Sequence, residues 1–480
     1  MTELLTAAQM RKLEKDAIDS SEVSGLTLME RAGQGVLESV FAKWPEFSGR
    51  TGRAIVLCGP GNNGGDGFVI GRLLAEKGWE IDLFLFGDAA KLPANARSNH
   101  DRWAEAHPVL AWDIVSYRQC ARPDLFVDAV FGIGLTRPLP EKVAAMLDPT
   151  AAKHWKRAGE IRRVAVDCPS GLDLDTGMIP LAADAEDSGY DPWPARMNAV
   201  DLTVTFHSPK PGHYLGMGPM LCKDLRVVDI GLRGSVLERS LLLSPPDPER
   251  ARLVVPEHAG RVLGWWPASL IGKMRHGGHK YDHGHILVFA GHAGRGGAAR
   301  LAARAALRAG AGLVTVLCPP AALQENAARL DAVMLRALPE DAPLASVVDD
   351  RITGFVLGPG MGVNARTRQL VLEALALRAG ARDHRDPAVV LDADALTSFA
   401  DDPEALFNAV HARTLLTPHQ GEFARLFPDL DAAFRAGSSK IAVVRQAAAR
   451  AGCLVLLKGH DTVIAEPGGG VSLHAASYDR

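Results

Sequence analysis

The segment that most constrains this chain is RAIVLCGPGNNGGDGFVIG, residues 53–71. Residues 54–58 form an apolar run typical of a strand, and residues 59–67 then supply five glycines, two asparagines and one aspartate. Phe68, Val69, Leu73 and Leu74 recur at helical spacing. A strand, a glycine-rich turn and a helix start favour an anion site, because glycine lets backbone N–H groups approach and the helix dipole attracts negative charge. A plain βα turn without a ligand is the alternative.

Composition narrows the classes of function. The chain has 480 residues, enough for about two to four domains, and its net charge of −3 gives no reason to expect nucleic acid or a membrane as partner. Six scattered cysteines without a C-x-x-C pair are typical of reduced thiols in a cytoplasmic protein. The N-terminus lacks the apolar core of a signal peptide, and no run approaches the ~18 apolar residues of a transmembrane helix.

Strand and helix patterns alternate through both halves. After a long helix over residues 6–40, the strand candidates are 54–58, 81–86, 125–130, 163–167, 202–206 and 226–230. In the second half they are 285–290, 312–318, 353–357, 388–391, 414–417 and 454–458, with an Ala-rich helix over 301–311. We expect two α/β domains with mostly parallel sheets covered by helices, at 1–235 and 276–480, joined by a linker and domain edge at 236–275.

Three polar side chains end or follow predicted strands of the first half. Asp128 lies in FVDAVFGIGLTRPL, Asp167 in VAVDCPSGLDLDTG, and Lys210 in VDLTVTFHSPKPGHY. Ligands of open α/β sheets bind at the carboxyl ends of strands. An aspartate there often caps the next turn, but two of them beside two glycine loops favour a functional site.

A dinucleotide-binding dehydrogenase is one alternative for this half. Gly59, Gly61 and Gly64 match G-x-G-x-x-G, and Asp88 lies near the required distance. A single match of this kind is weak evidence. The Asn62, Asn63 and Asp66 side chains would also crowd the approach that a pyrophosphate needs.

Several motifs of the first half together resemble the NAD(P)H-hydrate epimerase family. They are LMERAG, GNNGGDG, VDAVFGIGL, VDCPSGLD and TVTFHSPKPGHY, in order over residues 5–232. The resemblance implies that Asp167 is the catalytic acid/base and that Asn63, Asp128 and Ser170 bind a potassium ion, whose preference for oxygen ligands fits this set. It also implies a substrate site made of Asn62, Asn63, Gly64, Gly65, Asp66, Gly132, Ile133, Gly134, Leu135, Thr136, Arg137, Pro138 and Asp167. Cys168 replaces the apolar residue that is more usual there, which we expect to have no effect.

The second half resembles the ribokinase-like, ADP-dependent NAD(P)H-hydrate dehydratase family. HKYDHGHILVFAGHAGRGGAARLAARAALRAGAGLVTV, LGPGMG, LDADAL, LTPHQGEFARL and LKGHDTVIA carry the match. The resemblance implies a hydrate site at Ala298, Gly362 and His419, and ADP as co-substrate, with Mg²⁺ left open. It further implies contacts with the nucleotide phosphates from Lys458, Gly459, His460, Asp461 and Thr462. The fold class expected for the chain is therefore α/β, with two Rossmann-like or ribokinase-like three-layer domains.

Two other interpretations concern the second half. His276, His279, His283, His285 and His292 are dense enough to suggest a metal site, although alternate residues of a strand point to opposite faces. Kinases of hydroxymethylpyrimidine or thiazole share the fold that the resemblance implies, but LTPHQGEF fits dehydratases better. No Walker-type G-x-x-x-x-G-K-[ST] occurs in the sequence.

The resembled dehydratases continue with a G-[ST]-G-D segment whose Asp activates the substrate hydroxyl, and this sequence has none after Lys458. We therefore expect a truncated dehydratase domain with little or no activity. The function expected is repair of the hydrates of NADH and NADPH: epimerisation of R- and S-hydrates, and ADP-dependent dehydration of the S-hydrate. The alternative is an epimerase whose second domain is a nucleotide-binding or scaffold remnant. The expected partners are small molecules, and a homo-oligomer stays open.

Overall fold

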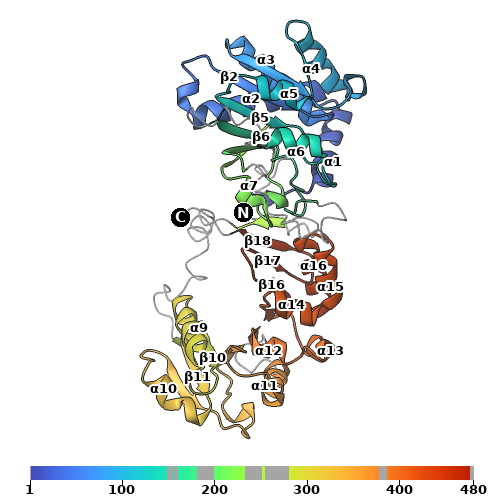
Figure 1. Ribbon diagram of the computed structural model, residues 1–480. Coiled ribbons are helices and arrows are strands. Elements are labelled where there is room, and N and C mark those ends of the chain that lie inside the picture. Colours follow the sequence, from blue (N-terminus) through green and yellow to red (C-terminus); the bar gives the residue numbers. More distant parts are fainter. Residues whose placement is uncertain are drawn as a thin grey trace. The chain divides into compact units, whose positions relative to one another are not determined.

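The computed structural model describes residues 2–148, 155, 161–180, 199–232, 251–254, 280–377 and 386–475. The chain divides into two compact units, Thr2–Pro245 and Pro246–Ala476, which we describe separately (Figure 1). Of the linker expected at 236–275, only 251–254 lies within the described ranges. Over those ranges, no helix is both long enough and apolar enough to cross a bilayer.

The first unit is built on a sheet of parallel strands in the order β4-β3-β2-β5-β6-β7-β8. These strands are β2 (Arg53–Cys58), β3 (Glu80–Leu85), β4 (Leu110–Ala111), β5 (Leu125–Ala129), β6 (Arg162–Val166), β7 (Leu202–Phe206) and β8 (Leu225–Val228). A further short strand, β1 (Thr2–Leu4), precedes them.

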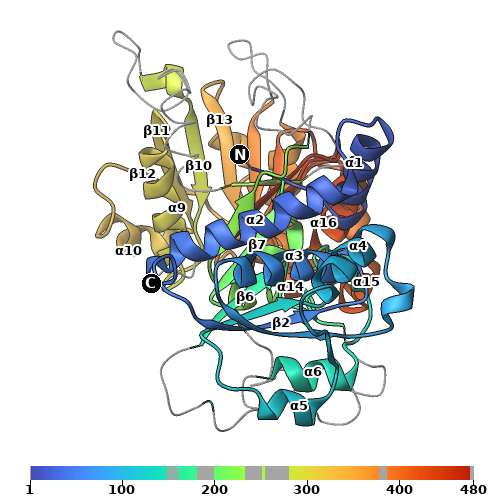
Figure 2. The same ribbon diagram turned by 90° about the horizontal axis from the view of Figure 1, so that it is seen from above.

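Helices cover both faces of this sheet. Alternate residues of β2 belong to two apolar clusters, one shared with α2 and α3 and the other with α5 and α6. The helices are α1 (Ala7–Asp19), α2 (Gly25–Lys43), α3 (Asn62–Glu76), α4 (Ala94–Ala104), α5 (Ile114–Gln119), α6 (Glu141–Leu147) and α7 (Gly218–Leu221). Figure 2 shows α2 lying along β7, which it contacts. Burial on both faces explains why these strands read as continuous apolar runs.

Two expectations for the first unit were wrong in detail. The helix expected over residues 6–40 is broken between α1 and α2, where Ser24 caps α2 by accepting a hydrogen bond from Thr27 N–H. The glycine-rich segment is not an open turn, because α3 already begins at Asn62. Its glycines allow close packing: a Cβ on Gly64 would lie 2.0 Å from the Gly59 carbonyl oxygen, and one on Gly59 would lie 1.8 Å from that of Val130.

The second unit has a sheet in the order β9-β18-β17-β16-β15-β14-β13-β10-β11-β12. The strands that run parallel from β16 to β12 are β16 (Leu454–Leu457), β15 (Thr414–Leu416), β14 (Ala388–Leu391), β13 (Ile352–Leu357), β10 (His285–Phe289), β11 (Leu313–Cys318) and β12 (Met334–Ala337). Three further strands complete it: β17 (Asp461–Ala465) and β18 (Val471–Ala475) form an antiparallel extension, and β9 (Ala251–Leu253) pairs with β18 in parallel. The mostly parallel α/β class is confirmed.

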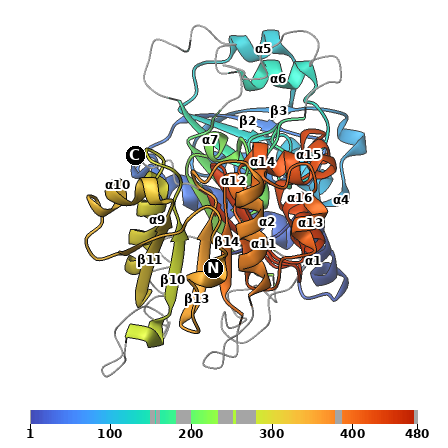
Figure 3. The ribbon, with the colours of Figure 1, turned by 90° about the horizontal axis from the view of Figure 1, so that it is seen from below.

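Helices also flank the second sheet. They are α9 (Gly297–Arg308), α10 (Leu323–Ala327), α11 (Ala365–Ala376), α12 (Asp394–Thr397), α13 (Pro403–Phe407), α14 (Gln420–Leu426), α15 (Pro428–Arg435) and α16 (Lys440–Ala451). Figure 3 shows α11 beside β14, and Figure 1 shows α16 beside β16 and β17. Helix α9 ends three residues before the expected end at 311, and β12, β17 and β18 were not expected.

Candidate functional site

The predicted epimerase residues come from three neighbouring strand ends. Strands β2, β5 and β6 are adjacent in the first sheet, so the start of α3, the loop after β5 and the loop after β6 meet at one edge. Asp128 lies within β5, opposite Ala165 of β6, and Asp167 is the first residue after β6. The topology therefore brings together the segments that sequence analysis singled out separately.

Asp167 is a buried carboxylate with two unlike oxygens. Its backbone φ of 66° is a strained conformation that Asp tolerates better than most residues. Oδ1 accepts hydrogen bonds from Lys210 Nζ at 2.9 Å and Thr205 Oγ1 at 2.7 Å, whereas Oδ2 accepts one from the Ile133 N–H at 3.1 Å. Burial raises the pKa of Asp167. The Lys210 charge and these side-chain hydrogen bonds lower it by more than burial raises it, so the net pKa lies below the usual value.

Strand β7, which contains Thr205, and the loop after it, which contains Lys210 and His213, supply three partners of Asp167 that the predicted site did not include. Lys210, Thr205 and His213 are all buried. His213 Nδ1 accepts from the Lys210 N–H at 3.0 Å, so the ring proton is on Nε2, which donates to the Asp167 carbonyl oxygen at 2.9 Å. Burial lowers the pKa of His213 to about 4, with a further contribution from the Lys210 charge. The available signal was the TVTFHSPKPGHY motif, which contains all three residues.

Two other carboxyl groups act on Asp167 electrostatically. Burial raises the pKa of Asp66, in the second turn of α3, well above its usual value, and the charges of Asp167 and Glu14 raise it more. Burial also raises the pKa of Glu14 in α1, against the opposing charge of Lys210. Carboxyl groups whose pKa values are shifted in opposite directions can serve as one base and one acid. Glu14 carried no sequence signal, because it belongs to an ordinary amphipathic helix.

Gly132 marks the space that these groups share. A Cβ at this position would lie 3.0 Å from Asp167 Oδ2 and 3.1 Å from Asn63 Oδ1. Asn63 and Asp167 therefore converge on the start of the 132–138 loop. The other predicted substrate residues belong to the start of α3 and to the 132–138 loop. Of these, Asn62, Gly134, Thr136, Arg137 and Pro138 are exposed, Ile133 is half-buried, and Gly64, Gly65 and Leu135 are buried.

The structure unites two of the three residues expected to bind potassium. Ser170 Oγ donates to Asp128 Oδ1 at 2.6 Å, and the Ser170 N–H donates to Asp128 Oδ2 at 2.8 Å. Burial raises the pKa of Asp128, although the hydrogen bonds from Ser170 oppose this effect. Asn63 Nδ2 is buried with no hydrogen-bond partner among the described residues. Carboxylate, hydroxyl and amide oxygens are a donor set that suits a hard cation.

Asp88, the acidic residue of the dehydrogenase alternative, has a local role. Its side chain caps the short turn Ala89–Lys91 by accepting a hydrogen bond from the Ala90 N–H at 2.9 Å. This explains the residue without a nucleotide ribose.

In the second unit, predicted residues meet at the carboxyl ends of β14, β15 and β16. Lys458 Nζ lies 2.5 Å from Asp392 Oδ1 and 3.9 Å from Glu422 Oε2. His419 caps α14, and its Nε2 lies 3.2 Å from Glu422 Oε1. Asp392 and Glu422, neither of which was predicted by number, thus connect Lys458 with His419.

Gly362 is tied to the same edge. Its N–H donates to Asp394 Oδ2 at 2.8 Å, and Ala393, between the two aspartates of LDADAL, has a positive φ of 48°. Such strain at a strand end is typical of ligand sites. Ala298 is exposed in the first turn of α9, after β10.

Of the five residues expected at the nucleotide phosphates, Lys458, Gly459 and His460 form the turn between β16 and β17, and Asp461 and Thr462 begin β17. Lys440 Nζ donates to Asp461 Oδ1 and to its carbonyl oxygen, both at 2.7 Å. Thr462 Oγ1 donates to the Gly459 carbonyl oxygen at 3.0 Å. The side chains of Asp461 and Thr462 therefore stabilise the turn, whereas Gly459 and His460 are exposed.

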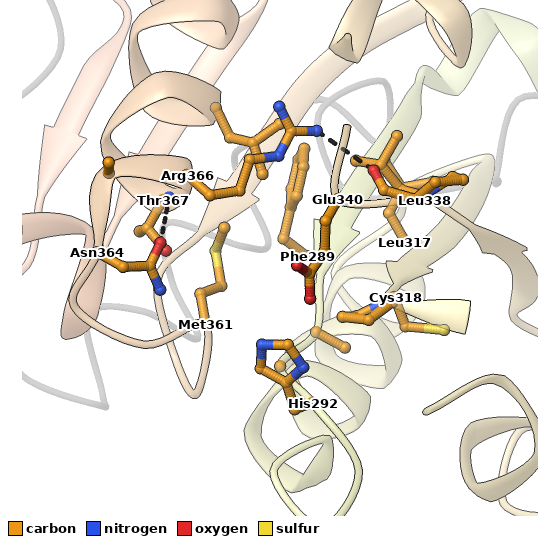
Figure 4. A pocket seen from close by; sticks show the side chains of 16 residues that line it. Phe289, His292, Leu317, Cys318, Leu338, Glu340, Met361, Asn364, Arg366 and Thr367 are labelled. Atoms are coloured by element: carbon orange, nitrogen blue, oxygen red, sulfur yellow. Dashed lines mark hydrogen bonds between the residues drawn. The ribbon is translucent and has the colours of Figure 1, made fainter. Parts of the chain in front are cut away.

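A cavity of about 320 Å³ lies next to Gly362, at the ends of β10, β11 and β13. Figure 4 shows Phe289 in its wall, with Met361 on one side and Leu317 and Leu338 on the other. His292, Glu340, Asn364 and Arg366 add polar groups to this apolar lining. An apolar cavity with few polar groups is typical of a small-molecule site.

The histidine-rich segment gives no sign of a metal centre in the parts of the chain that the structure describes. His276 and His279 lie outside those residues. His285 Nε2 lies 2.8 Å from Thr315 Oγ1, and His292 lines the cavity. Within the described ranges no group of three or more His, Cys, Asp or Glu side chains could hold a metal ion.

Comparison with known proteins matches both halves. Residues 25–212 match the family model of the YjeF-related protein N-terminus, and residues 286–478 match that of NAD(P)H-hydrate dehydratase. A bifunctional NAD(P)H-hydrate repair enzyme of Moorella thermoacetica is 33% identical over 496 residues, covering 98% of this chain and 83% of that protein. The chain belongs to the bifunctional NAD(P)H-hydrate repair enzyme family.

Other relatives match one half or both. An NAD(P)H-hydrate epimerase of Roseobacter litoralis is 42% identical over 246 residues, covering 48% of this chain and 100% of that protein. The bifunctional repair enzyme of Escherichia coli is 30% identical, covering 96% of this chain and 78% of that protein. A solved ADP/ATP-dependent NAD(P)H-hydrate dehydratase from Bacillus subtilis overlaps 43% of this chain and 69% of its own, at 24% identity and a TM-score of 0.34, too small an overlap to assign residues.

Proposed function

We propose that the first unit interconverts the R- and S-hydrates of NADH and NADPH, with Asp167 as the acid/base. The observation that carries this assignment is an ionised, buried carboxylate whose Oδ2 faces Gly132 and Asn63. The reacting carbon, C6, carries a hydroxyl group and is bonded to the ring nitrogen. A base that takes the hydroxyl proton lets the C6–N bond open to an aldehyde. Closure on the other face of that aldehyde inverts C6, and the proton returns to oxygen.

The remaining predicted residues of the first unit would bind the dinucleotide. Helix α3 begins at Asn62, shortly after β2, and the free N–H groups of a helix start favour an anion, which would suit the phosphates of the substrate. Asn63, Asp128 and Ser170 would hold a potassium ion through their amide, carboxylate and hydroxyl oxygens, and the partnerless Asn63 amide N–H group would donate to an acceptor on the substrate. The ion would supply charge close to the substrate phosphates. Asp128 and Ser170 also hold the loops after β5 and β6 together.

We propose that the second unit carries out the ADP-dependent dehydration of the S-hydrate. Lys458 would contact the nucleotide phosphates, and His419 and Gly362 would contact the hydrate. Asp392 and Glu422 are hard oxygen ligands beside Lys458 and would suit Mg²⁺, which in nucleotide sites uses one or two carboxylates together with phosphates. The low dehydratase activity expected from the sequence stays a prediction.

The decisive experiment starts from purified R-hydrate, which a dehydratase specific for the S-hydrate cannot use directly. The 480-residue chain is added with and without an active dehydratase and ADP supplied in trans, and reduced cofactor is followed by absorbance. We expect all of the R-hydrate to be converted to reduced cofactor when both are present, because the chain epimerises it to the S-hydrate that the dehydratase uses. Recovery no faster than with the added dehydratase alone would contradict the epimerase assignment.

A further inference from the structure

The proposed epimerase leaves one conspicuous group without a role, the buried ammonium of Lys210. Its Nζ donates to Asp167 Oδ1 at 2.9 Å, to Thr205 Oγ1 at 2.6 Å and to the Phe206 carbonyl oxygen at 3.2 Å. All three protons of the ammonium are therefore used. Lys210 is 1% exposed, so its side chain is enclosed by protein behind Asp167 rather than in the space before it.

Thr205 links the lysine to the carboxylate. Its hydroxyl accepts from Lys210 and donates its single proton to Asp167 Oδ1 at 2.7 Å. Oδ1 therefore carries two hydrogen bonds, one of them charge-assisted. Among the residues that the structure describes, Oδ2 accepts one hydrogen bond, from the Ile133 N–H, and it lies on the side of Gly132. Oδ1 of the carboxylate is thus held by protein side chains, whereas Oδ2 faces the space beside Gly132.

The same loop also fixes the backbone of Asp167. Lys210 N–H orients the His213 ring, and His213 Nε2 holds the Asp167 carbonyl oxygen. This contact supports a residue whose backbone is in the left-handed region. A carboxylate held at its main chain and at one oxygen has little freedom to rotate, which keeps the second oxygen in place.

We propose that Lys210 is a positioning residue of the epimerase site, which with Thr205 occupies Oδ1 of Asp167 and leaves Oδ2 as the oxygen that exchanges the proton with the substrate. The proposal rests on the epimerase function proposed above. Besides Lys210 and the neutral His213, the titratable groups that interact with Asp167 include Asp66 from α3 and Glu14 from α1, and the thiols of Cys168 and Cys222. Without the lysine, Asp167 would lose the cation that lowers its pKa and the charge-assisted hydrogen bond to Oδ1, so its two oxygens would be less clearly distinguished.

The test compares Lys210→Met, which keeps the length without the charge, with Thr205→Val, which keeps the shape without the hydroxyl. Epimer exchange is measured by chromatography over a range of hydrate concentrations. We expect Lys210→Met to lower kcat about a hundredfold or more and Thr205→Val about tenfold, with KM within threefold of wild type, because neither side chain reaches the substrate space. Lys43→Met, which removes the 2.7 Å ion pair with Asp224 elsewhere in the unit, is the matched control and should leave both parameters unchanged.

A rescue experiment separates positioning from a general loss of structure. In Lys210→Ala, added methylammonium should restore at least tenfold of the lost kcat, whereas tetramethylammonium, which has no N–H to donate, should not. Asp167→Asn should show no rescue by either ion. A folded Lys210→Met with kcat within threefold of wild type would overturn the proposal, and so would a Thr205→Val with unchanged kcat or equal effects of the two ions. If the wild-type chain itself fails to exchange epimers, the function proposed above fails instead.

Discussion

At the scale of single residues, burial shifts the pKa values of the acidic and basic groups of the epimerase site in opposite directions. Burial disfavours the charged form of the ionisable groups near Asp167. For Asp167 the charge of Lys210 outweighs this effect and the pKa falls, whereas the pKa of Asp66 stays raised. The pKa values of two neighbouring carboxyl groups are thus shifted in opposite directions, as in sites that use one carboxyl group as base and another as acid. His213 stays neutral for the same reason and therefore serves as a hydrogen-bond donor rather than as a cation.

The neutral His213 predicts a pH dependence of stability. Its pKa is about 4 in the folded protein against 6.5 as the reference value. Between those values the unfolded chain binds a proton that the folded chain does not, so this contribution to stability is lost as the pH falls from 6.5 toward 4. At pH 5 the loss should be about 2 kcal/mol.

Urea unfolding followed by tryptophan fluorescence at pH 7 and pH 5 measures this loss. His213→Gln can keep both hydrogen bonds and cannot titrate, so the wild type should lose about 2 kcal/mol more than this variant between the two pH values. The same loss in both proteins would contradict the assignment of a neutral, buried His213.

At the scale of elements, the start of α3 and the loops after β5 and β6 act together because β2, β5 and β6 are neighbours. The glycines of these segments have different purposes. Gly59 and Gly64 let the β2–α3 turn pack against backbone, whereas Gly132 leaves room between Asn63 and Asp167.

Gly132→Ala should therefore lower epimer exchange about tenfold or more without unfolding the protein. The added Cβ would press on Asp167 Oδ2 at 3.0 Å and Asn63 Oδ1 at 3.1 Å, displacing both from the reacting position. Gly49→Ala, whose Cβ would meet nothing within 4 Å, is the control. Steady-state kinetics and thermal melting of the two variants check the prediction, and equal activity of both would contradict it.

The proposed potassium ion should connect the same elements. We expect epimer exchange to rise with potassium to a plateau, at ionic strength kept constant with a bulky organic cation. Asp128→Ala should remove this dependence, since the aspartate supplies the only charge of the proposed ligand set. Equal rates in the two salts, together with an unaffected Asp128→Ala, would show that no such ion acts.

The sequence was informative about strands and motifs but not about contacts between distant loops. Apolar runs and glycine loops placed Asp128 and Asp167 at strand ends, because a doubly covered parallel sheet imposes those patterns. The role of Thr205 depends on β7 lying next to β6, and that of His213 on how the loop after β7 folds back toward Asp167, 38 and 46 residues away in the sequence. Strand β18 was missed because it is short and its polar residues Ser472 and His474 interrupt the apolar run.

At the scale of the whole molecule, the chain combines two sheets, each with its own set of charged groups at the carboxyl ends of its strands. Asp167 and Lys210 belong to the first unit, and Lys458, Asp392 and Glu422 to the second. Hydration of the reduced cofactor gives two epimers, the R- and S-hydrates. One chain that carries out both epimerisation and dehydration can therefore convert either hydrate back to the reduced cofactor.

The two sites should respond to mutation independently. Lys458→Met should weaken ADP binding about tenfold or more, because it removes a charged donor to phosphate, and should leave epimer exchange within twofold of wild type. Asp167→Asn should leave ADP binding unchanged. Isothermal titration with ADP, alongside the epimer assay, measures both effects. Loss of epimer exchange in a folded Lys458→Met would contradict the assignment of the reactions to separate units.

The most direct test of the central claim is the rate at which purified R-hydrate equilibrates with the S-hydrate, measured by chromatography for wild type and Asp167→Asn. Asparagine keeps the shape of the side chain but cannot take the hydroxyl proton. We predict that wild type equilibrates the epimers and that the folded variant is slower by about 10²–10⁴-fold, the usual contribution of a positioned acid/base. An Asp167→Asn protein that equilibrates the epimers within threefold of the wild-type rate would contradict the account.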